Sequence, residues 1–281
     1  MKIAVTGATG FIGSHLTEHL SAAGHEVTVL ARSPERLAWI RHLPVRVVYG
    51  DLERVDALRE LTAGQEVVVH AAGLTRAVRR SEFDRVNVGD SVRLLETALA
   101  RAPGLRRFVY LSSQAAMGPS PAGACLGEEA ARRPISAYGE SKSLAEEALA
   151  RFADRVPITF VRPPWVYGPR DRRTLAYFRL AVLGVRLVVG ARCRYSIVHA
   201  ADLADGIRLA AESTLPGARA YFFTDGDGRT AEDLSRIIAD AAGRRTVRVP
   251  VPVAAVAVVA AASELAGAVT RRPPFLGWRK L

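Results

Sequence analysis

Lys2-Ile-Ala-Val-Thr6 and Gly7-Ala-Thr-Gly10-Phe-Ile-Gly13 open the chain, and this stretch decides the fold. The β-branched run predicts a strand, and the glycines predict a tight turn into a helix that begins at about Gly10. Gly7 permits the turn, Gly10 removes a Cβ that would block a pyrophosphate, and Gly13 lets the helix lie close to the sheet. The free N–H groups at the helix start then face an anion. We therefore expect a dinucleotide to contact Gly7, Thr9, Gly10, Phe11, Ile12 and Gly13.

The simplest alternative interpretation is a glycine-rich turn without a ligand, and the elements around the turn argue against it. A strand precedes the turn, and a helix and a second strand follow it, as the motif requires. Strands are expected at 2–6, 26–31, 45–49, 66–70, 107–111 and 158–162. Helices are expected at 10–23 and 138–152, and a further helix carries Asn87 and runs to about residue 102. This alternation predicts an α/β Rossmann fold with a doubly wound parallel sheet.

The chain changes character after the sixth expected strand. Residues 163–171 are rich in proline, which excludes a helix or a central strand there. Shorter elements follow, with helices at 174–183, 202–211 and 231–242 and strands at 185–189, 195–199 and 221–224. We expect an NAD(P)-binding Rossmann domain at 1–165 and a smaller substrate-binding α/β region at 166–281, some of whose elements return to the Rossmann core.

Composition excludes several other classes of protein. The net charge of +11 comes from scattered arginines without a recognition motif, so no nucleic-acid partner is expected. A polyanionic cofactor or substrate, or a genomic bias toward arginine, accounts for the charge. The two cysteines, Cys125 and Cys193, have neither paired nor metal-type spacing, which predicts a cytoplasmic protein without disulfide or metal site. The chain enters a strand at once, so no signal peptide is expected.

Residues 251–269 are nearly all alanine and valine and require a membrane check. Pro252, Ser263 and Glu264 interrupt the run, and alanine contributes little to insertion. We expect a buried or surface-packed helix rather than membrane contact, with peripheral contact as the alternative.

The end of the second expected strand indicates which dinucleotide is bound. It reads Leu30-Ala31-Arg32-Ser33, without the carboxylate that would hydrogen-bond the adenosine ribose of NAD. An arginine attracts a 2′-phosphate and can donate two hydrogen bonds to it. Arg32 therefore favours NADP over NAD, unless Arg32 is only a solvated residue at a helix start.

Two further strand ends are expected to contact the cofactor. Asp51 follows the third strand and can accept a hydrogen bond from the adenine amino group, with Leu52 against the ring. After the fourth strand, the small residues Ala71, Ala72 and Gly73 leave room for the cofactor. His70 is expected to be a packed strand-end residue.

Three residues are expected to carry the chemistry. Ser113 follows the fifth strand, and Tyr138 and Lys142 lie one helical turn apart on one helix face. A tyrosine has a pKa near 10, and a neighbouring lysine and a cationic nicotinamide favour its phenolate. Tyr138 would exchange a proton with a substrate alcohol or carbonyl, Lys142 would also bind the nicotinamide ribose, and Ser113 would hold the substrate oxygen.

These signposts resemble the extended short-chain dehydrogenase/reductase family, also called the NAD-dependent epimerase/dehydratase family. The similarity covers nearly the whole chain and includes, in order, the glycine turn, Asp51-Leu52, His70-Ala-Ala-Gly73, Asn87, Ser112-Ser113, Tyr138-x-x-x-Lys142, Arg162-Pro163 and His199-Ala-Ala-Asp202-Leu203. The resemblance implies that Ser113 rather than Ser112 is catalytic and that Pro163 lines the nicotinamide. It also implies that Asn87 supports the central helix or a bound water. A homodimer through the helix of Tyr138 and the preceding helix is common in the family.

Departures from the family separate its subclasses. Dehydratases carry an Asp-Glu pair after the catalytic hydroxyl, whereas Gln114-Ala-Ala-Met117 stands here. Pro163-Pro-Trp-Val-Tyr-Gly-Pro169 resembles the branch near 3β-hydroxysteroid dehydrogenases and dihydroflavonol reductases. Aromatic and sulfur side chains suited to an apolar ring substrate, or to ordinary lid packing, are Trp165, Tyr167, Met117 and Tyr195.

Three functions follow from these observations. The first is an NADP-dependent oxidoreductase that interconverts an alcohol and a carbonyl on a hydrophobic small molecule. The second is a nucleotide-sugar epimerase or reductase that uses bound NAD(P), with the diphosphate held by Arg76, Arg79, Arg80 and Arg194. The third, a cofactor-binding protein without turnover, is disfavoured by the complete Ser113, Tyr138 and Lys142 set.

Overall fold

A computed structural model describes residues 1–121, 124–189 and 194–270 of the chain. The chain forms two compact units. The first consists of Met1–Thr75, Arg79–Pro163 and Ala200–Phe223, and the second of Arg76–Val78, Pro164–His199 and Thr224–Leu281. Each unit is described by itself below.

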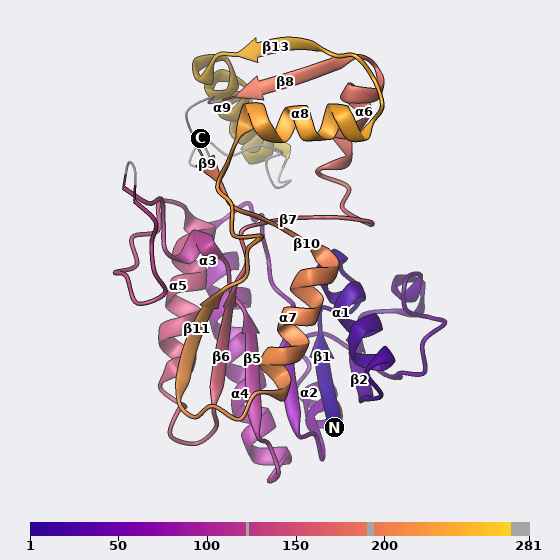
Figure 1. Ribbon diagram of the computed structural model, residues 1–281. Helices are drawn as coiled ribbons and strands as arrows, with labels where there is room; N and C mark the ends of the chain where they lie inside the picture. Colours follow the sequence, from indigo (N-terminus) through magenta and orange to yellow (C-terminus); the bar gives the residue numbers. More distant parts are fainter. Residues whose placement is uncertain (122–123, 190–193, 271–281) are drawn as a thin grey trace. The chain divides into compact units, whose positions relative to one another are not determined.

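A seven-stranded parallel sheet forms the centre of the first unit (Figure 1). Its spatial order is β11-β6-β5-β4-β1-β2-β3, in which the chain reverses direction across the sheet between β1 and β4. The strands are β1 (Lys2–Thr6), β2 (Glu26–Ala31), β3 (Arg46–Tyr49), β4 (Val67–His70), β5 (Arg107–Leu111), β6 (Ile158–Arg162) and β11 (Ala218–Phe222). This arrangement confirms the predicted Rossmann fold, whose ligands bind at the carboxyl ends of the strands beside that reversal.

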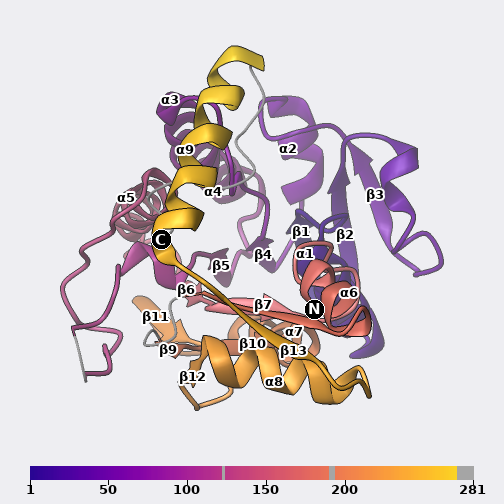
Figure 2. The same cartoon turned by 90° about the horizontal axis from the view of Figure 1, so that it is seen from above.

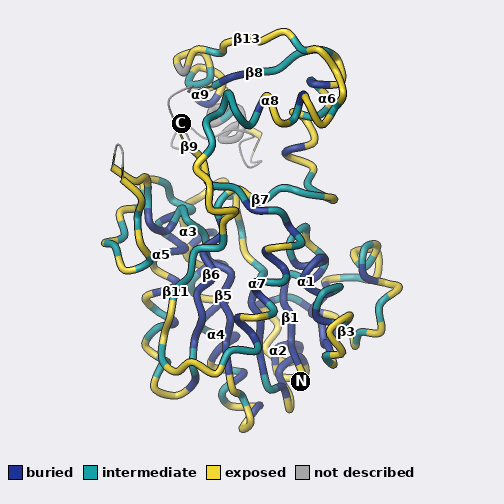
Figure 3. The backbone as a smooth tube through the Cα atoms, in the orientation of Figure 1, coloured by how far each residue is buried: buried dark blue, intermediate teal, exposed yellow. Residues whose placement is uncertain are grey.

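Helices cover both faces of this sheet (Figure 2). One face carries α1 (Phe11–Ala22) and α7 (Ala200–Glu212), and the other carries α2 (Val55–Thr62), α4 (Asp90–Arg101) and α5 (Ala137–Ala150). The sheet is therefore buried on both sides, and Figure 3 shows its central strands as the most buried part of the unit. Continuous apolar strand sequences are typical of such a position.

The helix around Asn87 differs from the prediction. The sequence predicted one helix that carries Asn87 and runs to about residue 102, whereas the structure has α3 (Arg80–Phe83), a π-helical segment (Asp84–Gly89) and then α4. A π-helical turn is undetectable in a 3.6-residue pattern, and such turns often lie at functional sites. Asn87 lies within this segment and is buried.

The described part of the second unit contains three two-stranded sheets. Its strand pairs are β7 (Trp165–Tyr167) with β10 (Ile197–His199), β8 (Val185–Val189) with β13 (Val247–Val251), and β9 (Arg194–Tyr195) with β12 (Arg229–Thr230). Its helices are α6 (Leu175–Val182), α8 (Ala231–Ala241) and α9 (Val253–Thr270). The sequence predicted neither β7 nor β13, because prolines precede the first and lie within the second. In a two-stranded sheet every strand is an edge, where proline is tolerated.

Two other expectations for this part of the chain were inexact. The strand predicted at 195–199 is divided into β9 and β10, and the strand predicted at 221–224 begins earlier, at Ala218, and pairs with β6 in the first unit. The alanine- and valine-rich run forms α9, where Ala260 is buried and Val258 and Val259 are exposed. Within the described ranges, no helix combines the length and the apolar content needed to cross a membrane.

Candidate active site

The turn between β1 and α1 packs its backbone so closely that neither Gly7 nor Gly13 has room for a side chain. Gly7 has φ of +75°, and a Cβ there would lie 2.6 Å from the Ala72 nitrogen. A Cβ on Gly13 would overlap the Gly7 carbonyl oxygen. Gly10 is the N-cap of α1 and supplies no side-chain cap, so Thr9, Phe11 and Ile12 flank a helix start that offers backbone N–H groups. This cradle fits a dinucleotide pyrophosphate by shape and by donor chemistry.

The expected adenosine-binding residues follow β2 and β3. Arg32 is exposed directly after β2. Asp51 uses Oδ1 to accept hydrogen bonds from the backbone of Glu53 (3.0 Å) and Arg54 (3.1 Å). Leu52 is buried in the core cluster. The structure therefore gives Asp51 and Leu52 structural contacts, and their contacts with adenine remain predictions.

The end of β4 brings the glycine turn close to α5. The Ala71 nitrogen donates to the Thr6 carbonyl (3.1 Å), and the Ala72 nitrogen donates to Thr6 Oγ1 (3.3 Å). A Cβ on Gly73 would lie 3.0 Å from Asn87 Oδ1 and 3.4 Å from Lys142 Nζ. Gly73 therefore leaves open the space beside the lysine ammonium.

Ser113 and Tyr138 lie on two elements that touch. Ser113 is the N-cap of a short 3₁₀ turn (Gln114–Ala116), and its Oγ accepts a hydrogen bond from the Ala115 nitrogen (3.1 Å). A Cβ on Gly139 would overlap the Ala115 carbonyl oxygen, so this glycine lets the first turn of α5 lie against the serine turn. Tyr138 is in that first turn, with its ring centroid 6.2 Å from that of Phe83. Sequence analysis missed Gly139, although it directly follows Tyr138.

Two other residues that were expected at the site, Pro163 and Lys142, are buried and hydrogen-bonded to neighbouring segments. Pro163, at the end of β6, is buried, and its carbonyl accepts a hydrogen bond from the Gln114 nitrogen (3.0 Å). Lys142 is buried on α5, and its Nζ donates to the Leu111 carbonyl (2.7 Å) and the Tyr110 hydroxyl (3.1 Å). Burial lowers the pKa of Lys142 to about 7, and the nearby Glu146 carboxylate opposes that shift. The charge of the lysine is therefore sensitive to its neighbours at neutral pH.

Glu146, one turn after Lys142, is the centre of a buried polar cluster that sequence analysis missed. Its carboxylate accepts hydrogen bonds from Ser112 Oγ (2.5 Å), Arg132 Nη1 (3.2 Å) and Arg162, through Nε (3.0 Å) and Nη2 (2.6 Å). Ser112 thereby has a structural partner, whereas Ser113 lies on the adjacent turn. The only signal in the sequence was a carboxylate four residues beyond the lysine on the same helix face.

Asn87 and His70 both have structural roles. Asn87 Oδ1 accepts a hydrogen bond from the Leu74 nitrogen (2.8 Å), while Nδ2 donates to the Leu74 carbonyl (2.9 Å) and to Ser141 Oγ (2.9 Å). Of the two roles that the resemblance implied, the side chain therefore performs the first, support of α5. His70 is fully buried, as expected, and lies 2.6 Å from Thr6 Oγ1 and 2.8 Å from Ser91 Oγ. Burial and the Lys142 charge lower the pKa of His70 to about 3.

The side chains expected to contact an apolar substrate are divided between the units. In the second unit, the ring centroid of Trp165 lies 5.9 Å from that of Tyr177 and 6.5 Å from that of Tyr195, and we call these three residues the aromatic cluster. Tyr167 packs instead against His199. Met117 belongs to the first unit and is only 2% exposed, so it is a core residue.

Among the arginines proposed for a diphosphate, Arg80 and Arg194 interact with the following protein groups. Arg80 lies 2.7 Å from the Glu140 carboxylate and 4.0 Å from that of Asp84. Arg194 donates to the Gly228 carbonyl (2.6 Å).

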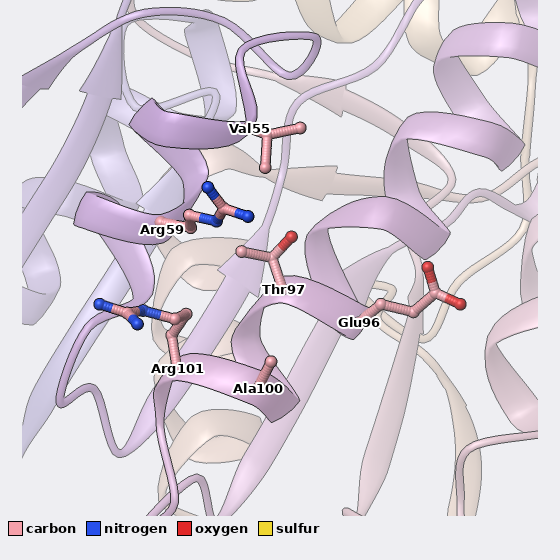
Figure 4. A pocket seen from close by; sticks show the side chains of 6 residues that line it. All are labelled: Val55, Arg59, Glu96, Thr97, Ala100 and Arg101. Atoms are coloured by element: carbon pink, nitrogen blue, oxygen red, sulfur yellow. The ribbon is translucent and has the colours of Figure 1, made fainter.

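A surface depression of about 610 Å³ lies between α2 and α4 (Figure 4). Its lining residues are Val55, Arg59, Glu96, Thr97, Ala100 and Arg101. None of them is among the expected catalytic or cofactor-binding residues, and both helices lie on the outer face of the sheet rather than at its carboxyl edge. The depression is therefore separate from the candidate active site.

Comparison with known proteins agrees with the fold and the glycine turn. The sequence pattern of the NAD-dependent epimerase/dehydratase family matches residues 3–221. The chain belongs to this family. Ceramide reductase of Caulobacter vibrioides is 36% identical over 253 residues, which cover 89% of this chain and 74% of that protein.

Two other members show the range of the family. The 3β-hydroxysteroid dehydrogenase/Δ5→4-isomerase of Mycobacterium tuberculosis is 30% identical over 267 residues, which cover 87% of this chain and 70% of that protein. The solved structure of Thermus thermophilus UDP-glucose 4-epimerase in complex with NAD is 26% identical with a TM-score of 0.76, and the match covers 90% of this chain and 86% of that one. The predicted resemblance, including the steroid dehydrogenase branch, is confirmed. The protein is an NAD(P)-binding oxidoreductase of this family.

Proposed function

We propose that this protein is an NADP(H)-dependent oxidoreductase that interconverts an alcohol and a ketone or aldehyde on a hydrophobic small molecule. The observation that carries the proposal is the placement of Lys142. A buried ammonium held by Tyr110 and Leu111 lies one helical turn from Tyr138, and the start of that helix touches the turn of Ser113.

Each of the three residues has a role in this reaction. The bound nicotinamide supplies or accepts the hydride. In reduction, Tyr138 gives its phenolic proton to the carbonyl oxygen and is left as a phenolate, which the Lys142 ammonium stabilises and solvent reprotonates. Ser113 Oγ already accepts a hydrogen bond from Ala115, so its own proton is the group that holds the substrate oxygen.

The substrate class rests on the aromatic cluster and on the relatives. Trp165, Tyr177 and Tyr195 expose between 37% and 40% of their surface. Aromatic rings present broad apolar area to a ligand. The Caulobacter and Mycobacterium relatives are named for a ceramide and a steroid, both largely hydrocarbon. We assign the aromatic cluster to the apolar part of the substrate.

Epimerisation of a nucleotide sugar is the second candidate, because the chain shares its fold with the Thermus UDP-glucose 4-epimerase at 26% identity. The existing bonds of Arg80 and Arg194 count against it, since a diphosphate would compete with Glu140 and with the Gly228 carbonyl.

A pair of assays distinguishes the two functions. Purified protein is incubated with NADPH and a series of ketones and aldehydes that range from acetone to long-chain and fused-ring compounds, and absorbance at the nicotinamide band is followed. A parallel incubation with UDP-glucose and NAD is analysed for UDP-galactose. We expect consumption of NADPH that increases with the apolar size of the carbonyl compound and no conversion of the sugar. Sugar conversion without carbonyl reduction would overturn the proposal.

A further inference from the structure

The ammonium of Lys142 is held by a tyrosine that the proposed reaction does not otherwise use. Tyr110 is fully buried on β5, and its hydroxyl accepts a hydrogen bond from Lys142 Nζ (3.1 Å), which also lies 4.4 Å from the centre of its ring. The Leu111 carbonyl accepts a second bond from the same nitrogen (2.7 Å). An ammonium has three N–H donors, so these bonds leave one.

The hydroxyl of Tyr110 has a fixed direction. It donates its only proton to the Asn87 carbonyl oxygen (3.3 Å). Burial raises the pKa of Tyr110 well above its ordinary value, so the phenol stays neutral. A neutral phenol that gives its proton to Asn87 presents a lone pair to Lys142. Tyr110 is therefore an acceptor for the ammonium and is unable to replace Tyr138 as the proton donor.

Neighbouring hydrogen bonds hold the Asn87 carbonyl in place. Ser91 Oγ donates to the same carbonyl oxygen (2.8 Å), so it must accept the bond from His70 Nε2 (2.8 Å). His70 is neutral and has one ring proton, so Nδ1 accepts a bond from Thr6 Oγ1 (2.6 Å). Each proton in this chain of hydrogen bonds therefore has an acceptor, from Thr6 at the glycine turn to the Asn87 carbonyl that orients Tyr110.

We propose that Tyr110 is a positioning residue, whose neutral hydroxyl orients the Lys142 ammonium and stabilises its charged form. The proposal rests on the proposed function in that Tyr138 and Lys142 are taken as the reacting pair. The open side of the ammonium faces Gly73, and the remaining N–H donor is the one available to the cofactor ribose or to Tyr138.

Other groups also act on the lysine charge and must be separated from Tyr110. Glu146 and Tyr138 lie on α5 with Lys142, and His70 approaches from β4. Glu146 favours the ammonium, and His70 is neutral. Since the Glu146 carboxylate is bonded to Ser112, Arg132 and Arg162, removal of the Tyr110 hydroxyl leaves those bonds in place.

The test is Tyr110→Phe, which removes the hydroxyl and keeps the ring. In cofactor-free protein that contains ¹³Cε,¹⁵Nζ-lysine, the pKa of Lys142 is measured by NMR and assigned with Lys142→Met. We expect this pKa to fall by about one unit, because a hydrogen bond to a charged group is lost. In turnover, kcat falls about tenfold, and the alkaline limb of its pH profile moves to lower pH. Thr62→Val, which removes an equally buried hydroxyl from α2, is the matched control and leaves both quantities unchanged.

An unchanged lysine pKa and an unchanged alkaline limb in Tyr110→Phe would overturn the proposal, even if the variant were less stable. Should Tyr110→Phe fail to fold, 3-fluorotyrosine at position 110 keeps the shape and weakens the hydroxyl as an acceptor. The proposal then expects a smaller downward shift of the lysine pKa, and no shift contradicts it. Since the NMR measurement needs neither cofactor nor turnover, it tests Tyr110 even if carbonyl reduction is not the reaction.

Discussion

The carboxyl end of the sheet in the first unit and the aromatic cluster of the second unit differ in how their side chains are held. Lys142, Asn87 and Glu146 are at most 5% exposed and hydrogen-bonded to protein groups, whereas Trp165, Tyr177 and Tyr195 are at least 37% exposed and meet mainly through ring edges. A buried polar group must have a partner, so one change there disturbs several others. An exposed aromatic ring can be replaced at little cost in stability. We propose that the first group fixes the reaction and that the second contributes to substrate choice.

Removal of the Glu146 carboxylate has the largest expected effect, and it tests whether the buried polar side chains at the carboxyl end of the sheet depend on one another. Glu146→Leu leaves the buried Arg162 guanidinium without its ion pair, and we expect a loss of about 3–5 kcal/mol in the free energy of unfolding. Glu147→Leu removes the exposed pair with Arg151 and is expected to cost less than about 0.5 kcal/mol. Urea denaturation measures the free energy of unfolding of both variants. Equal losses would contradict the claim that the buried ion pair contributes more to stability than the exposed one.

The charge of Lys142 gives the buried group a distinct pH dependence. Its pKa in the folded protein is about 7, against 10.5 for a free lysine. Between these values the unfolded chain binds more protons, so the free energy of unfolding must rise with pH in this window. Relative to Lys142→Met, we expect the wild type to gain on the order of 1–3 kcal/mol from pH 7 to pH 10. Parallel stability curves for the two proteins would show that the lysine is not perturbed.

Trp165→Ala tests the proposed role of the aromatic cluster in substrate binding. Removal of the indole should raise KM for a large apolar carbonyl compound about tenfold and change kcat less than about threefold, because only apolar contact area is lost. Trp165→Phe should have an intermediate effect, and a small substrate such as acetone should show none. A loss of kcat with unchanged KM would place Trp165 in the chemistry instead of substrate binding.

Arg32→Ala tests cofactor choice and has the smallest expected effect. We expect NADPH to bind about tenfold more weakly while NADH changes less than about twofold, because an exposed arginine contributes one charge-assisted contact to a 2′-phosphate. Arg41→Ala, at a nearby exposed position, is the control. Fluorescence titration gives the four affinities, and tighter binding of NADH than NADPH by the wild type would reverse the assignment.

The parts of the molecule that depend on local sequence were predictable. The glycine turn, the parallel sheet and the expected positions of Ser113, Tyr138 and Lys142 follow from short patterns whose meaning is set within one strand–turn–helix unit. The cluster around Glu146 was not, because Arg132, Arg162 and Ser112 come from three other segments that meet only when α5 packs on β5 and β6. Tyr110 was similarly hidden, since it appeared as one apolar residue of a buried strand.

The errors outside the site have physical causes as well. Prolines obscured β7 and β13, which are stable only as edges of two-stranded sheets. The π-helical turn at Asn87 breaks the helical period, so the sequence predicted one helix where the structure has three segments. Met117 was expected either to contact an apolar substrate or to serve in ordinary packing, and its side chain packs into the core. In each case the deciding interaction is tertiary and leaves little trace in local composition.

The central claim is that Tyr138 transfers the proton with the assistance of Lys142. The most direct measurement compares wild type and Tyr138→Phe in NADPH-dependent carbonyl reduction and in NADPH binding. The account predicts a loss of kcat of about 10²–10⁴-fold with a cofactor dissociation constant within about threefold of the wild type. Turnover at the wild-type rate by Tyr138→Phe would contradict it.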